Sequence, residues 1–192
     1  MNETSVSLIQ RLKTPQDVAA WRRFDALYRP WLGTWLRRQG VADADADDLT
    51  QETLTVVMKR LPAFEHNGHP GAFRLWLRSI LANCLKVFRR RGRDRSPGGE
   101  ALVEMAARLE DPRSELSRLW DQQHDRHLLA TLLELLAAEF EPRTLLAFRR
   151  LMLDGHTAEA TAAETGLSLG AVYVAKSRVL RRLREELHEL MD

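Results

Sequence analysis

The C-terminal part of the chain constrains the fold most, because it contains two helical patterns separated by a single glycine turn. Residues 157–164 are rich in alanine, the strongest helix former, and Gly166 can adopt the left-handed conformation that ends a helix. Ser168 can then cap a second helix over residues 171–187, a stretch that contains neither glycine nor proline. The sequence therefore predicts a short helix, a tight turn and a longer helix.

The second of these helices is amphipathic and has a basic side. Its apolar residues recur at three- and four-residue intervals and share one face: Val172, Ala175, Val179, Leu183 and Leu187. The stretch 176–184 contains basic residues and no acid. This is the helix-turn-helix pattern, in which the second helix enters the major groove of DNA. An amphipathic pair inside a helical bundle, with solvated arginines, is the alternative, and the basic bias favours DNA binding.

Composition is that of a folded globular protein, and the distribution of charge along the chain indicates what it could bind. A chain of 192 residues can form one medium or two small domains, and 44% hydrophobic with 29% charged residues excludes wholesale disorder. The formal net charge is only +2, yet acids gather in 43–52 and basic residues in 86–95 and 176–184. Phosphate backbones respond to such local fields, so the basic stretches are candidate nucleic-acid contacts.

Cysteine content and hydropathy indicate the compartment. The single cysteine, Cys84, excludes an internal disulfide and is typical of a reducing environment. No apolar run approaches the length of a membrane span, and the N-terminal residues lack the apolar core of a signal peptide. We therefore expect a soluble, cytoplasmic protein that does not insert into a membrane.

Two helices are predicted in the N-terminal third of the chain. The first covers 16–39, is interrupted or restarted at Pro30, and carries an aromatic and aliphatic stripe typical of a core: Trp21, Phe24, Leu27, Tyr28, Trp31, Trp35 and Leu36. The second covers 43–61, begins with aspartates that favour the positive end of the helix dipole and can cap free N–H groups, and buries Leu49 and its apolar neighbours. A calcium loop is excluded here, because its sixth position would be Asp48 and its twelfth Leu54.

A loop over 62–72 precedes a third helix over 73–91. The predicted core-facing residues of that helix are Leu75, Trp76, Ile80, Leu81, Leu85 and Phe88. Aromatic residues and arginines on one helix suit single-stranded nucleic acid, whereas a buried helix with a basic tail would explain only the aromatics. No metal site is expected, because the pairs His66/His69 and His124/His127 lack a suitable third ligand nearby.

Glycine, proline and serine in GRDRSPGGE mark the start of a linker, and helices resume from residue 123. Pro142 then occupies the first turn of a helix over 143–153. The predicted fold class is all-α, with two small helical domains over 1–95 and 123–192 joined by a linker over 96–122.

Three motifs, in this order and at these separations, carry a resemblance to a known family. They are DADDLTQETL (45–54), AFEHNGHPGAFRLWLRSILANCLKVFRRR (63–91) and LSLGAVYVAKSRVLRRLREEL (167–187). The chain resembles bacterial RNA polymerase sigma factors of the extracytoplasmic-function (ECF) type, which keep only sigma domains 2 and 4. The resemblance covers about residues 21–95 and 123–186.

The resemblance implies a non-catalytic subunit without a cofactor, which recruits core RNA polymerase through its β′ and β subunits and opens promoter DNA. It implies that four residues of the acidic helix bind the polymerase: Asp48, Leu49, Gln51 and Glu52. It implies that a second set holds the melted minus-10 strand: Phe64, His66, Asn67, Arg78, Asn83, Lys86, Arg89 and Arg90. A third set would read the minus-35 element in the major groove: Gly170, Tyr173, Val174, Ser177, Arg178 and Arg181. Family members are often held by an anti-sigma factor, and nothing in the sequence identifies one.

The chain departs from the family pattern at a few positions. Thr161 and Thr165 replace usually aliphatic residues, which predicts looser packing because buried hydroxyls need partners, and Val87 stands where an aspartate is common. Two other functions explain less of the sequence. A stand-alone repressor or activator leaves the acidic helix and the aromatic core unexplained, and an enzyme acting on nucleic acid finds no P-loop, nucleophile motif or paired carboxylates.

Overall fold

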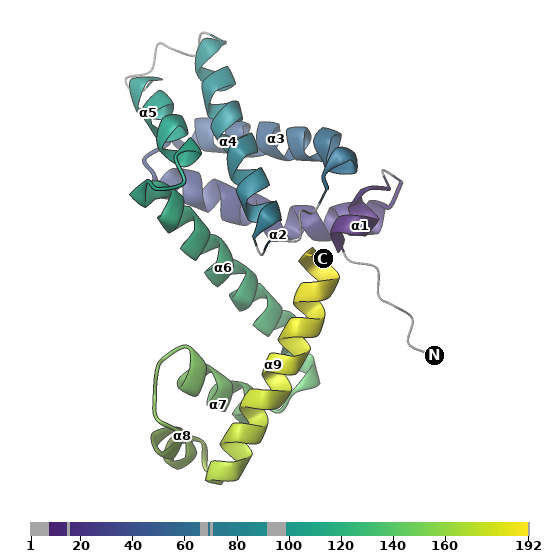
Figure 1. Cartoon of the computed structure of the whole chain (residues 1–192), viewed down its shortest axis with the longest axis vertical. Helices are drawn as coiled ribbons and strands as arrows, with labels where there is room; N and C mark the ends of the chain where they lie inside the picture. The colour runs from purple at the N-terminus through teal and green to yellow at the C-terminus, as the bar shows by residue number, and fades with distance from the viewer. Residues whose placement is uncertain (1–7, 15, 66–68, 70, 92–98, 192) are drawn as a thin grey trace. The chain divides into compact units, whose positions relative to one another are not determined.

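The structure is a computed structural model that describes residues 8–14, 16–65, 69, 71–91 and 99–191 (Figure 1). Within these residues every regular element is a helix, which confirms the all-α expectation. They are α1 (Leu8–Leu12), α2 (Val18–Arg38), α3 (Asp43–Arg60), η1 (Leu61–Ala63), α4 (Ala72–Arg90), α5 (Gly99–Glu110), α6 (Glu115–Leu135), η2 (Leu136–Glu139), α7 (Pro142–Met152), α8 (Ala158–Thr165) and α9 (Leu169–Met191). The chain divides into two compact units within α6, after His127.

The first unit is built on α2, whose aromatic stripe is its core. Phe24, Tyr28 and Trp35 are each only 2% exposed. Helix α3 packs on α2, and Phe73 of α4 packs edge-on against the rings of Phe24 and Tyr28. Helix α2 begins where the Asp17 carboxylate accepts a hydrogen bond from the backbone N–H of Ala20, 2.9 Å away. It then continues through Pro30 to Arg38, so the expected interruption at Pro30 is absent. The surrounding packing therefore outweighs the cost of the one hydrogen bond that proline removes.

The aspartates at the start of α3 lie in the first turns of the helix, as predicted, but none caps it. The capping residue is Ala42, which offers no side-chain hydrogen bond. The carboxylates of Asp43 and Asp47 instead accept hydrogen bonds from Arg37, at 2.8 and 2.6 Å. These aspartates therefore link the end of α2 to the start of α3 through exposed ion pairs, which contribute little to stability.

Helix α4 begins at Gly71, which has a φ of 82° and so adopts the left-handed conformation in which a side chain is strained. Leu77, Ile80 and Leu81 are at most 1% exposed and form its buried face, and Cys84 is buried as a small apolar residue. Leu75, predicted to face the core, is instead 43% exposed. Ile80, Leu81, Leu85 and Phe88 are buried as predicted, and Trp76 is half-buried. The buried side of α4 also includes the arginine at position 78, which is only 6% exposed.

The segment predicted as a linker is largely helical and packed. Helix α5 packs along α4, and Ala106, Leu109 and Trp120 are at most 1% exposed. The hydroxyl of Ser117 donates to the carbonyl oxygen of Leu109 at 3.1 Å. This hydrogen bond joins the end of α5 to the start of α6 across the turn between them. Residues 99–127 therefore belong to the first unit in this structure, because their apolar side chains are buried there.

The second unit contains the helix, turn and longer helix predicted from the C-terminal sequence. The Thr157 hydroxyl caps α8 by accepting from the N–H of Ala160 at 3.2 Å, and Gly166 ends the helix with a φ of 69°. The Ser168 hydroxyl accepts from the N–H of Ala171 at 3.2 Å at the start of α9. Val172 and Val179 are fully buried, which fixes the side of α9 that faces outward.

Replacing Thr161 by valine is expected to raise the free energy of unfolding of the second unit by about 1 kcal/mol. Thr161 is fully buried, and its hydroxyl has no hydrogen-bond partner within the described residues, so an isosteric methyl removes a desolvation cost. Thermal and chemical denaturation measure the gain. Thr165→Val is the control, since its hydroxyl donates to the Thr161 carbonyl oxygen at 2.7 Å. An equal gain from both variants would contradict this explanation.

Candidate nucleic-acid interface

Three cations on α4 form ion pairs with acids of the segment 99–127. The Arg74 Nη1 atom lies 2.6 Å from the Asp125 carboxylate, and Arg78 Nη1 lies 3.1 Å from Asp121. Further along the helix, Lys86 Nζ lies 2.5 Å from Glu110. Guanidinium and ammonium groups of this kind bind phosphate by the same hydrogen bonds that they make to carboxylates. The acids of α5 and α6 thus occupy positions that a nucleic-acid backbone could take.

A buried hydrogen-bond network anchors α6 beside these ion pairs. His124 is 1% exposed, and its Nε2 atom lies 3.2 Å from the hydroxyl of Tyr28. Burial lowers the pKa of His124, against the opposing effect of the Asp125 carboxylate, 3.4 Å from its Nδ1 atom. A neutral ring that donates from Nδ1 to the carboxylate can accept from the Tyr28 hydroxyl, so the arrangement satisfies both nitrogens.

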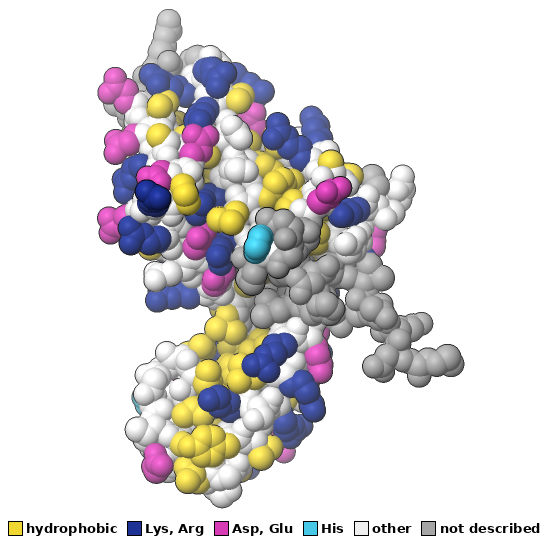
Figure 2. All heavy atoms as spheres, in the orientation of Figure 1, with side chains coloured by type: hydrophobic (Ala, Val, Ile, Leu, Met, Phe, Trp, Pro, Cys, Tyr) yellow, Lys and Arg dark blue, Asp and Glu magenta, His cyan; other side chains and the backbone are white. Residues whose placement is uncertain are grey.

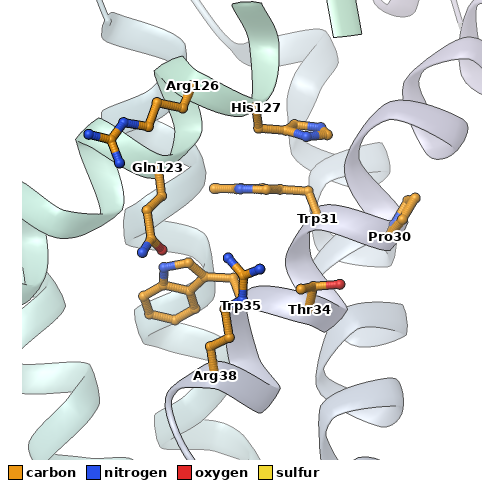
Figure 3. Close-up of a pocket in the computed structure, with 8 residues that line it drawn as sticks. All are labelled: Pro30, Trp31, Thr34, Trp35, Arg38, Gln123, Arg126 and His127. Atoms are coloured by element: carbon orange, nitrogen blue, oxygen red, sulfur yellow. The ribbon is translucent and has the colours of Figure 1, made fainter. Parts of the chain in front are cut away.

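Aromatic rings complete the contact between α2 and α6. Trp120 is fully buried, with its ring centroid 4.6 Å from that of Trp31 and 4.8 Å from that of Trp35. Two turns further on in α6, the His127 ring stacks on Trp31 with an interplanar angle of 16°, and Figure 3 shows the two rings one above the other. Beside these rings lies an open cavity of about 410 Å³, with Arg38 and Arg126 among its lining residues. Aromatic packing and ion pairs therefore both hold α6 in place.

The residues expected at the minus-10 strand differ widely in exposure. Phe64 is 7% exposed and packs on Trp76, with ring centroids 4.9 Å apart. His66 and Asn67 lie outside the described residues. Arg78 is buried in its ion pair, and Lys86 is half-buried in its own. Asn83 and Arg90 are exposed and Arg89 is half-buried, so the C-terminal half of α4 presents the more accessible part of the set.

The four residues expected at the polymerase surface also separate into accessible and buried ones. Asp48 and Gln51 are exposed on α3, and the half-buried Glu52 is paired with Arg91. Leu49, in contrast, is fully buried. The periodicity of α3 placed Leu49 in the core and the resemblance placed it at the surface, and the structure agrees with the periodicity.

A shallow groove runs beside the exposed side of α3. Its volume is about 370 Å³, and its lining includes Trp21 of α2 with Gln51 and Met58 of α3. Val18 and Met58, at its edge, are 57% and 50% exposed. The lining also includes Arg22, Asp25 and Arg29 of α2, so the groove combines exposed apolar side chains with charged ones, as surfaces that bind protein partners do.

All six residues expected at the minus-35 element are exposed on the outward side of α9: Gly170, Tyr173, Val174, Ser177, Arg178 and Arg181. Tyr173 and Val174 are 52% and 56% exposed. Figure 2 shows hydrophobic side chains at the end of the second unit where α8 and the start of α9 lie, with Lys and Arg side chains along α9. Exposed apolar side chains at the start of the helix can contact base edges, and the basic residues that follow can bind phosphates.

The arginines of α9 have different surroundings. The Arg182 guanidinium lies within 2.7–3.0 Å of three carboxylates, those of Glu139, Glu185 and Glu186. Arg178 lies over the ring of Phe140, 5.8 Å from its centroid. Arg182 therefore holds η2 against α9, whereas Arg178 and Arg181 remain on the exposed side.

Sequence reasoning missed the residues that hold the segment 99–127 in place. Arg74 was not assigned to any site, and Asp121 and Trp120 were placed in a linker. One signal was available: Trp120, His124 and His127 recur at four- and three-residue intervals, which is typical of one buried helix face. The glycine- and proline-rich residues before them outweighed that signal.

Comparison with known proteins identifies the family to which this chain is related. Residues 19–95 match the Sigma-70 region 2 family, which covers α2, α3 and α4. The ECF RNA polymerase sigma factor SigD of Mycobacterium tuberculosis is 32% identical over 160 residues, covering 83% of this chain and 69% of that protein. The ECF RNA polymerase sigma factor ShbA of Streptomyces griseus is 33% identical over 153 residues, covering 77% of this chain and 74% of that protein.

The chain belongs to the ECF RNA polymerase sigma factors, as its sequence motifs predicted. Proteins of this family are non-enzymatic factors of transcription initiation that bind core RNA polymerase and promoter DNA. In the part of the chain that the structure describes, no helix is long and apolar enough to cross a membrane.

Proposed function

We propose that this protein recruits core RNA polymerase through α3, reads a minus-35 element with α9 and helps to melt the minus-10 element with α4. The observation that supports it best is the combination of an accessible acidic helix and an exposed basic recognition helix in one chain. Each of these surfaces suits a different macromolecule, and a sigma factor has to hold both polymerase and DNA.

For polymerase binding, the exposed residues Asp48 and Gln51 carry the proposal, together with Glu52. Helix α3 carries these residues and also contributes Gln51 and Met58 to a shallow groove, so a partner helix can bury apolar side chains in the groove and pair its cations with the carboxylates of α3. By resemblance, that partner is the pair of clamp helices of the β′ subunit. Leu49 contributes by packing α3 on the core rather than by contact.

For promoter binding, the outward side of α9 is proposed to enter the major groove at the minus-35 element. Tyr173 and Val174 lie at the N-terminal end of the helix, where recognition helices contact base edges, and Arg178 and Arg181 follow at positions suited to phosphates. On α4, Asn83, Lys86, Arg89 and Arg90 are proposed to hold the melted minus-10 strand.

Replacing both Asp48 and Glu52 by alanine is expected to weaken binding to core polymerase by about tenfold, or about 1.4 kcal/mol. The two carboxylates lie one turn apart on the same side of α3, so both lose their pairing with the basic partner. Affinity is measured with purified bacterial core polymerase, and run-off transcription from promoter templates reports the functional consequence.

The matched control is Asp43→Ala with Asp47→Ala, which removes the same charge from the same helix where the acids bind Arg37. This control should bind core polymerase nearly as well as the wild type. Equal losses in both double variants would point to net charge rather than to a specific surface. Failure of the wild type to bind core at low salt, with tight binding to duplex DNA alone, would instead favour a stand-alone DNA-binding regulator.

A further inference from the structure

The basic face of α4 is already occupied by another part of the same chain. Arg74, Arg78 and Lys86 lie on this face, and each forms an ion pair with an acid from residues 99–127. The proposed function assigns Lys86 to the minus-10 strand, and the family resemblance assigns Arg78 to the same strand. Figure 2 shows acidic and basic side chains intermingled on the side of this unit where α5 lies.

The cations of these ion pairs differ in how accessible they are to another anion. Arg78 is only 6% exposed, and its Nη1 atom also lies 3.4 Å from the carbonyl oxygen of Ser117 on α6. A phosphate cannot reach this guanidinium unless α6 moves, because the helix covers it. Lys86 is half-buried under Glu110 at the end of α5, so its pair is the more accessible of the two.

Apolar contacts hold the acids in position. Leu109 and Leu116 are 1% and 5% exposed, and Trp120 is fully buried between α2 and α6. These side chains place Glu110, Asp121 and Asp125 along α4, at sequence distances of 24 to 51 residues from their basic partners. Buried apolar side chains thus hold these carboxylates against the basic face of α4.

We propose that residues 99–127 are an internal competitor for the promoter strand: their carboxylates occupy the cations of α4 that the strand needs. This inference rests on the proposed function, since it concerns the same minus-10 surface. Carboxylate and phosphate satisfy a guanidinium by the same charge-assisted hydrogen bonds, so only one can be bound at a time. The affinity of the free protein for DNA is then its intrinsic affinity multiplied by the fraction of molecules in which the segment is undocked.

The test is binding of full-length protein to a fluorescent pool of random-sequence single-stranded 20-mers, compared between wild type and Asp121→Asn/Asp125→Asn. Asparagine preserves the shape of each side chain and removes the charge that holds Arg74 and Arg78. We expect the double variant to bind the pool at least tenfold more tightly, with faster hydrogen exchange in α6.

The matched control is Glu104→Gln/Glu115→Gln, which removes the same charge from two exposed positions of α5 and α6. It should gain far less affinity than the Asp121/Asp125 variant. Adding Arg78→Met to the open variant should remove most of the gain, because the uncovered guanidinium is the expected phosphate ligand. Glu110→Gln alone, which opens only the accessible Lys86 pair, should gain about twofold to threefold and leave the fold intact.

Three results would overturn the inference: equal gains in the two double variants, faster exchange in α6 without a gain in affinity, or a gain that survives Arg78→Met. Core-polymerase binding by the wild type separates these results from a failure of the proposed function. If the wild type binds core and initiates transcription while the open variant gains nothing, the internal competitor is wrong and the sigma assignment stands.

Discussion

Replacing Trp120 by alanine is expected to lower the free energy of unfolding of the first unit by about 3–5 kcal/mol. Trp120 is fully buried, and its ring lies within 5 Å of the rings of both Trp31 and Trp35, measured between centroids. Truncation leaves a large cavity at the centre of the contact between α2 and α6, and the surrounding rings cannot close it without losing their own packing.

The matched control is Trp120→Phe, which retains most of the aromatic packing. The indole N–H of Trp120 has no hydrogen-bond partner within the described residues, so removing it also removes a desolvation cost. We expect this variant to change the stability by less than about 1 kcal/mol. Chemical denaturation followed by fluorescence and far-ultraviolet circular dichroism measures both changes.

The Trp120→Ala variant also tests whether residues 99–127 are a linker or part of the folded unit. A segment that only connects two domains would tolerate the truncation, and the stability of the first unit would not change. A loss of several kcal/mol, with new tryptic cleavage at Arg108, Arg113 or Arg118, would show that the segment is folded on α2 and α4 in the free protein.

Elements that depend on neighbouring residues were predicted well from the sequence. The turn at Gly166, the cap at Ser168 and the buried face of Val172 and Val179 all lie where short-range signals placed them. Glycine conformation, side-chain caps and helical periodicity are local properties, so a single sequence contains enough information to fix them. Of the three motifs that carried the family resemblance, 45–54 lies on α3, most of 63–91 lies on α4, and 167–187 lies on α9 and the turn before it.

Contacts between distant parts of the chain were not predictable in the same way. Arg78 and Asp121 are 43 residues apart, and neither residue's neighbours indicate the other as its partner. The assignment of 96–122 to a linker rested on the glycine and proline content of its first residues and ignored the buried spacing around Trp120. Leu75 shows the same limit on a smaller scale, since which apolar residues of α4 are buried depends on the helices that pack against it.

Replacing Arg178 and Arg181 by glutamine is expected to weaken holoenzyme binding to the minus-35 element by about tenfold at physiological salt. Both side chains are exposed on the outward side of α9, where they can reach phosphates once the N-terminal end of the helix enters the groove. Each phosphate contact that is lost should also reduce the slope of log affinity against log salt by about one, so the double variant should lose about two.

Arg182→Gln provides a control from the same basic run of sequence. Its guanidinium is held by Glu139, Glu185 and Glu186, so it is expected to stabilise the second unit rather than to bind DNA. This variant should lower the thermal midpoint of that unit and leave the salt slope unchanged. The sequence shows these arginines as one basic stretch, whereas their contacts divide them by role. Equal changes in salt slope for Arg182→Gln and the double variant would contradict that division and mean that the whole basic side of α9 faces the phosphates.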